Sequence, residues 1–229
     1  MFSHVEATNN FRAYGPLHIS IIAITILIML FSFKMKRNKI YEKSMVFTIG
    51  LCQIILFTWY LTGTKFYEEG LPFYTCRLSG VFFVISYFFD KKSLKACGVY
   101  LGFVGGIMAI LTPEMYPYSM LHFTNLNFFF YHICLLSISS YYMVHEKDDI
   151  LNRQKNTQKI VFVLLILIAI LNSKIGTNYS YTAIPPVARN LFQKLNWFVY
   201  FFILVMLYQI SIIIEAKIMK KIDYKKRVI

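Results

Sequence analysis

The feature that most constrains the fold of this chain is its series of long apolar runs. Runs of about 18 residues or more recur along the 229 residues, and as a helix each can cross a hydrocarbon core of about 30 Å. We therefore predict an all-α, polytopic membrane protein that forms a compact bundle of seven transmembrane helices in a single domain, 1–229. The predicted spans are 16–33, 44–63, 71–89, 94–112, 121–144, 157–173 and 195–214. The sixth has the shortest strictly apolar core, IVFVLLILIAIL.

Composition excludes a soluble domain. The chain is 57% hydrophobic and only 15% charged, and it contains 22 Phe and 17 Tyr, a balance that soluble domains of this size do not show. Its net charge of +13 would suit nucleic acid, but the basic residues cluster at the ends of apolar runs. We expect the partner to be membrane phospholipid and not nucleic acid.

The basic residues also predict the topology. Lys and Arg collect in the segments 34–43, 91–95, 147–159 and 217–227, which together hold 18 of the 24 basic residues. These segments all lie on one side of the membrane if seven spans alternate. The positive-inside rule assigns that side to the cytoplasm, so the N-terminus is predicted outside and the C-terminus inside. We expect a multi-pass protein of a bacterial plasma membrane.

The cysteines and histidines favour neither a disulfide framework nor a metal site. The cysteines (Cys52, Cys76, Cys97 and Cys134) show no CxxC spacing. A metal site built from His18, His122 and His132 is conceivable, but no His pair at i, i+4 supports it. We predict no metal and no cofactor.

The predicted fifth span carries a polar stripe. His122, Asn125, Phe129 and His132 follow at spacings of 3, 4 and 3, so they share one helical face. Polar side chains of a membrane helix should face the bundle interior or a wet cavity. Interhelical hydrogen bonding is the simplest interpretation for Asn125. For His132, near mid-depth, a structural and a chemical role both stay open.

A second polar element opens the third span, in LPFYTCRLSG (71–80). Pro72 suits a first helical turn. Cys76 follows as a candidate nucleophile. Arg77 and the helix dipole favour its thiolate form, whereas burial opposes it. Cys76 can equally be a small buried residue without a chemical role. Arg77 can bind a phosphate bidentately, or it can snorkel or pair with a nearby Glu.

The predicted topology places many of these polar residues in the outer half of the membrane or its loops. We therefore expect a cavity open to the outside. The outer residues are His18, Cys76, Arg77, Glu114, His122, Asn125, Asn178 and Arg189, with His132 below them.

Several short segments resemble the YwaF-like bacterial integral membrane proteins, relatives of eukaryotic transmembrane protein 164. They are YGPLH (14–18), LPFYTC (71–76), TPEMYP (112–117), FFFYH (128–132) and GTNYSY (176–181). The resemblance implies a compact seven-helix fold and a link to acyl transfer onto ether phospholipids by a Cys and a His. His132 matches the histidine of that family. Its cysteine directly follows the proline, where this chain has Phe73, and Cys76 lies one turn further on the same face.

Two functional hypotheses follow. The first is a phospholipid acyltransferase or related lipid-acyl hydrolase, with His132 as general base, Cys76 as nucleophile and His122 as a second catalytic candidate. Its substrate-binding residues would be Arg77, Asn125, His18, Tyr74 and Asn178. The alternative is a non-enzymatic small-solute carrier or ligand-binding sensor that uses the same cavity.

Overall fold

The structure is a computed structural model that describes residues 3–6, 9–192 and 194–222. Every regular element in these residues is helical. The long helices are α1 (Pro16–Lys34), α2 (Lys39–Leu61), α3 (Thr75–Phe89), α4 (Lys92–Leu111), α5 (Phe123–His145), α7 (Gln154–Ile175) and α9 (Trp197–Lys221). The short elements are η1 (Phe66–Gly70), α6 (Lys147–Asn152), η2 (Tyr179–Tyr181) and α8 (Arg189–Phe192).

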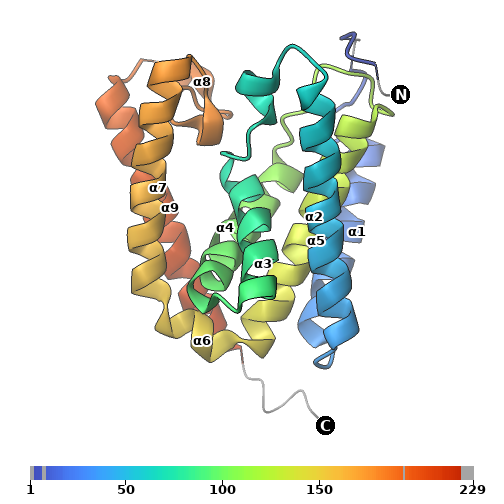
Figure 1. Ribbon diagram of the computed structural model, residues 1–229, viewed down its shortest axis with the longest axis vertical. Coiled ribbons are helices and arrows are strands. Elements are labelled where there is room, and N and C mark those ends of the chain that lie inside the picture. Colours follow the sequence, from blue (N-terminus) through green and yellow to red (C-terminus); the bar gives the residue numbers. More distant parts are fainter. Residues whose placement is uncertain (1–2, 7–8, 193, 223–229) are drawn as a thin grey trace.

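The long helices run side by side along the long axis of the molecule (Figure 1). The N-terminal end of α1 lies at the same end as α8 and the connection between α2 and α3, and α6 lies at the opposite end with the last turns of α9. Helices α1 to α5 pack on one another, and α7 and α9 form a pair at one side that contacts α4. We call the end that holds the start of α1 the outer end and the other the inner end.

Five helices are long and apolar enough to cross a membrane, namely α1, α2, α4, α7 and α9. The apolar helix α3 has only 15 residues. Large apolar side chains are exposed along the outward faces of these helices, such as Leu27, Ile54 and Phe202, as lipid contact requires. The chain is thus an all-helical, multi-pass membrane protein, and the count of seven spans stays a prediction.

Helix α5 forms the centre of the bundle. It buries 17 of its 23 residues, and α1, α2, α3 and α4 pack around it. Its Asn, His, Ser and Tyr side chains therefore face protein and not lipid. The peripheral helix α1 shows the same logic, because its three buried side chains, His18, Thr25 and Ser32, are all polar. Polar groups point inward because hydrocarbon offers them no hydrogen bonds.

The start of α3 differs from the prediction. The span was predicted from Leu71, but the helix begins at Thr75 with Tyr74 as its N-cap, so Pro72 precedes the helix instead of occupying its first turn. The backbone at Leu71 is extended (φ −70°, ψ 147°), as the residue before a proline prefers. Cys76 consequently lies in the first turn of α3.

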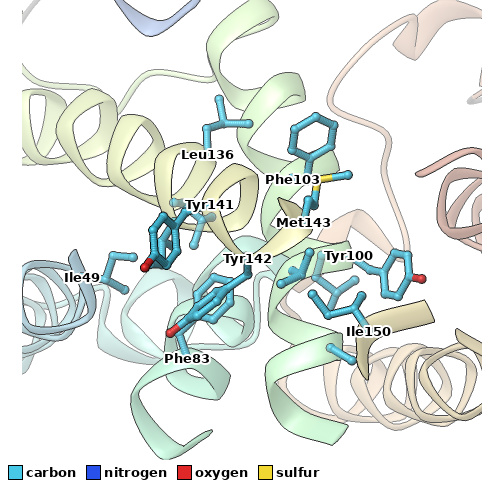
Figure 2. Packing of buried hydrophobic residues seen from close by; sticks show 14 of the residues in the cluster. Ile49, Phe83, Tyr100, Phe103, Leu136, Tyr141, Tyr142, Met143 and Ile150 are labelled. Carbon is cyan, nitrogen blue, oxygen red and sulfur yellow. The ribbon is translucent and has the colours of Figure 1, made fainter. Parts of the chain in front are cut away.

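Glycines on α4 let its neighbours approach closely, as the spacing of Gly98, Gly102 and Gly106 predicts. A Cβ at Gly98 would lie 2.8 Å from the Phe83 ring, and one at Gly102 would lie 2.5 Å from the Ser79 hydroxyl. Figure 2 shows the core built at this contact, where Phe83 lies against Tyr142 with ring centroids 5.6 Å apart.

This packing predicts opposite outcomes for two adjacent glycines. A Cβ at Gly106 would lie 2.5 Å from the Cγ of buried Leu136, whereas one at Gly105 would first meet the Cys76 Cβ at 3.4 Å. We expect Gly106→Ala to cost about 1–3 kcal/mol through overpacking. Gly105→Ala should be neutral or stabilise by up to about 1 kcal/mol through helix propensity. Thermal unfolding of the two variants in detergent checks this, and equal melting temperatures would contradict the packing.

Candidate functional site

A large cavity connects the outer end of the bundle with its interior. Its volume is about 740 Å³, and its walls come from α2, α3, α4, α5 and α9. The segments 114–118 and 180–192 contribute further residues at the outer end. Of the predicted site residues, Tyr74, Cys76, Arg77 and His132 line this cavity.

Arg77 is a buried charged group at the outer end of the cavity, and its residue is only 6% exposed. The cavity is also lined by the charged residues Lys65, Glu68, Glu69 and Glu114. The Nη1 of Arg77 donates to the carbonyl oxygens of Glu69 and Leu71, the latter at 3.3 Å. Its Nη2 donates to the Tyr116 hydroxyl at 2.7 Å. Three of its five N–H groups are used in this way. The N–H of Nε and one N–H of Nη2 meet no acceptor among the described residues, so they are available to an anionic ligand.

Two aromatic rings flank the guanidinium. Its Cζ lies 5.3 Å from the ring centroid of Tyr74 and 5.8 Å from that of Tyr60, within the range of cation–π attraction. No carboxylate within the described residues forms an ion pair with Arg77. The charge is therefore stabilised by dipoles and rings, which leaves it able to bind an external anion.

Asn125 positions the loop that carries Tyr116. Its Oδ1 accepts a hydrogen bond from the Tyr116 N–H at 3.0 Å. Its Nδ2 donates to the carbonyl oxygens of Tyr118 and Ser119 at 3.0 and 3.1 Å. Asn125 is fully buried and does not line the cavity. It thus supports the Arg77 site through Tyr116 and does not face a ligand.

Glu69 completes the outer end of the cavity. Its Oε2 accepts a hydrogen bond from the Tyr74 hydroxyl at 3.0 Å. Burial raises the pKa of this carboxyl, and the bond from Tyr74 and the charge of Arg77 oppose that rise without cancelling it. The carboxyl is therefore protonated more readily than an exposed one.

His132 lies on α5 with its side chain in the cavity wall, and its residue is 4% exposed. Its Nδ1 is 2.7 Å from the Phe128 carbonyl oxygen. A carbonyl can only accept, so Nδ1 carries the proton and Nε2 presents a lone pair. No described group bonds to Nε2, and the charge of Arg77 is close enough to act on the ring. An imidazole held in this tautomer can serve as a general base.

Cys76 lines the same cavity from the first turn of α3. Its carbonyl accepts a hydrogen bond from the Tyr131 hydroxyl at 2.9 Å, which connects α3 to the residue before His132. Tyr131 also accepts a bond of 2.9 Å from Gln53. The thiol is free and makes no hydrogen bond to a histidine in the described part of the chain. Cys76 and His132 share a cavity without touching.

The other predicted site residues lie outside the cavity lining and make structural hydrogen bonds. His18 accepts from the Tyr14 N–H at 2.9 Å and contacts the Ile110 carbonyl at 2.7 Å, which ties α1 to α4. His122 caps α5. Asn178 accepts from the N–H groups of Ala183 and Ile184 at 3.1 and 3.0 Å. We leave these residues out of the proposed site.

No metal centre is found among the described residues. They contain no group of three or more His, Cys, Asp or Glu side chains that could hold a metal ion. The cysteines Cys52, Cys76, Cys97 and Cys134 are all free.

A segment that the sequence did not single out closes the cavity at its outer end. Pro185, Pro186 and Val187 line the cavity there. Arg189 forms an ion pair of 2.6 Å with Glu114, which joins this segment to the connection between α4 and α5. The prediction of an outer polar cluster included Glu114 and Arg189 but gave no sign of their pairing. The sequence did not identify Tyr116 as a site residue, because a tyrosine in a loop gives no sign that it contacts a buried arginine.

The raised pKa of Glu69 predicts how stability depends on pH. The favourable contribution of this carboxyl to the free energy of unfolding is fully present below the pKa of the unfolded state, about 4.3. It is lost as the pH rises through the higher pKa of the folded state. Glu69→Gln avoids that loss, so above this range we expect its melting temperature to exceed that of the wild type by roughly 2–4 °C. The exposed neighbour variant Glu68→Gln is the control. Thermal unfolding from pH 4 to pH 8 checks this; a constant difference between Glu69→Gln and the wild type would contradict it.

The described geometry can be set beside known proteins. The chain matches the TMEM164 family over residues 13–215, from just before α1 to the later turns of α9. No curated protein and no solved structure matches it. The family match agrees with the resemblance to relatives of eukaryotic transmembrane protein 164 that the short segments indicate. The chain belongs to the TMEM164 family.

Proposed function

We propose that this protein binds a phospholipid in its cavity and transfers or hydrolyses one of its acyl chains. The observation that carries the proposal is that one cavity of about 740 Å³ holds a buried guanidinium, a thiol and a histidine with a free ring nitrogen. These are the groups needed to hold an anionic headgroup, attack an ester and move a proton.

The proposal places the cavity mouth on the outside of a bacterial plasma membrane, with seven crossings and the N-terminus outside. The long helices alternate in direction (Figure 1), so the segments 34–43, 91–95 and 147–159 all lie at the inner end. Their basic residues support a cytoplasmic inner end. A phospholipid of the outer leaflet would then meet Arg77 at headgroup depth.

The lining supports an amphiphilic ligand. Arg77 and the hydroxyl groups around it occupy the outer end, and α9 lines the cavity with Ile203, Leu204, Leu207, Ile210 and Ile214. From Tyr200 to Ile214 this wall runs for about 21 Å at 1.5 Å per residue. An extended chain of about 16 carbons has a similar length, at about 1.25 Å per staggered bond.

The chemistry can be written with the residues present. Nε2 of His132 takes the thiol proton of Cys76, and the thiolate attacks the ester carbonyl carbon of the lipid. The ester C–O bond breaks, and the leaving alkoxide takes the proton back from the imidazolium. The resulting thioester is then attacked by the hydroxyl group of a second lipid or by water, with His132 again accepting the proton, and the thiol is released.

A second candidate is a small-solute carrier or ligand-binding sensor without chemistry. One observation favours it, namely that the Cys76 thiol makes no hydrogen bond to His132 and its Cβ packs close to Gly105. For such a protein Arg77 would still bind an anion, but no covalent intermediate would form. Ligand-dependent stability that survives Cys76→Ser would then be the expected property.

The enzyme proposal predicts a specific loss at His132. In His132→Asn the new amide can still donate to the Phe128 carbonyl, but the basic Nε2 is gone. We expect the rate of acyl transfer to fall by about a hundredfold or more. The measurement is acyl exchange between labelled phospholipids in reconstituted vesicles, together with lipid profiling of cells that carry the variant.

His122→Asn is the matched control, because it removes a histidine from the same helix while asparagine is a favoured N-cap. It should keep full activity. An unchanged lipid profile and exchange rate in His132→Asn would rule out the enzyme proposal, and Cys76→Ser with full exchange would rule out the thioester route.

The headgroup role of Arg77 makes a separate prediction. In Arg77→Lys a point charge replaces the planar group, so a bidentate contact to phosphate is lost. We expect the KM for phospholipid to rise about tenfold while kcat changes little. The exposed residue Arg189 gives the control variant Arg189→Lys. A fall in kcat with unchanged KM would contradict a headgroup role.

A further inference from the structure

An acidic side chain that the proposed chemistry does not use is buried on α9. Glu215 is 4% exposed, and neither of its carboxylate oxygens has a hydrogen-bond partner among the described residues. A bare carboxylate in such surroundings is strongly disfavoured, and carboxyl groups in apolar sites are neutral by protonation. The sequence prediction ended the seventh span at Ile214 and so did not reach this residue.

Tyr100 on α4 is a second buried polar group of this kind. Its side chain is fully buried, and its hydroxyl also has no partner in the described part of the chain. The hydroxyl and the carboxylate of Glu215 are close enough to interact electrostatically. In Figure 2 the Tyr100 hydroxyl points away from the rings of Phe83 and Tyr142. Two buried polar groups without a hydrogen-bond partner among the described residues thus lie on the neighbouring helices α4 and α9.

This pair lies just below the inner end of the cavity. Ser211 lines the cavity on α9 and Val104 lines it on α4. Glu215 follows Ser211 by four residues, and Tyr100 precedes Val104 by four. Residues four apart share one helical face, and α4 runs opposite to α9, so both groups lie one turn further inward. They lie beyond the residues that line the cavity at its inner end.

No other described charged group accompanies Glu215 on the helices that pack against α9, which are α4, α6 and α7. Lys95 pairs with Glu146, Lys92 and Arg153 pair with Asp149, and Lys147 donates to the Ile222 carbonyl. The remaining charged residues there and on the end of α9 are exposed: Asp148, Lys155, Lys159, Lys174, Lys217, Lys220 and Lys221. Cys97, the other titratable group of α4 near Tyr100, contacts Thr157.

We propose that Glu215, on α9 beside the helix that carries Tyr100, is a proton-binding site just beyond the inner end of the cavity. A proton fits this site better than a metal ion, because the described residues offer no cluster of three ligands and hard cations need about six oxygen ligands. Glu215 releases its proton to water in the cavity or at the inner surface, about 9 Å away at Lys221. The remaining carboxylate accepts a hydrogen bond from the Tyr100 hydroxyl. This site does not depend on the acyl-transfer proposal.

The test is labelling of the full-length protein with dicyclohexylcarbodiimide in detergent, followed by peptide mass spectrometry. The reagent adds to protonated carboxyl groups in apolar surroundings, and all atoms of both partners stay in the adduct. We expect selective modification of Glu215 near pH 6, which falls about tenfold for each pH unit above its midpoint. Glu215→Gln removes the adduct. Exposed Glu114 is the internal control and should stay unmodified.

Tyr100→Phe keeps the ring and removes only the hydroxyl. Without that donor the carboxylate is less stable, so labelling should persist to higher pH. The proposal fails if Glu215 is modified no more than Glu114 or if its modification does not depend on pH. It also fails if sodium ions suppress the modification at constant pH, since the site would then bind a metal cation. Size-exclusion chromatography of each variant verifies that it is folded.

Discussion

The outer end of this molecule depends on how one guanidinium is stabilised away from water. Arg77 is 6% exposed and has no carboxylate partner among the described residues, so dipoles and aromatic rings must replace its hydration. The carbonyl groups that it binds, on Glu69 and Leu71, are free only because the backbone before Thr75 is not part of an α-helix. The broken entry into α3 and the inward fold of the 112–122 connection follow from this requirement.

The same requirement explains why the central helix is polar. Tyr116 can reach Arg77 only while its loop is held in place. Asn125 of α5 holds that loop through three hydrogen bonds between its side-chain amide and backbone atoms. Facing lipid, such an amide would be unsatisfied. It therefore belongs on a helix enclosed by α1, α2, α3 and α4. The many buried polar side chains of α5 thus fit its central position.

Part of this arrangement could be predicted from the sequence, and the rest could not for identifiable reasons. The apolar runs locate the long helices, and the glycine spacing on α4 identifies its packing face, because both depend on local periodicity. The partners of Asn125 are loop backbone atoms, and those of His18 are the Tyr14 N–H and the Ile110 carbonyl of α4; their positions depend on packing between segments that are distant in the sequence. Glu215 was missed because the apolar run stops at Ile214, whereas the helix continues to Lys221.

Under the proposed function, the lining of the cavity suits a lipid ester better than a hydrated solute. The Nε2 of His132, which has no partner among the described residues, shares the cavity with Arg77 and the apolar wall of α9, and in a phospholipid the ester groups lie between the headgroup and the acyl chains. A small polar solute bound at Arg77 would leave the long apolar part of the cavity without a partner. An amphiphile fills both parts, and its ester then lies in the same cavity as the histidine and the thiol that the proposed chemistry uses.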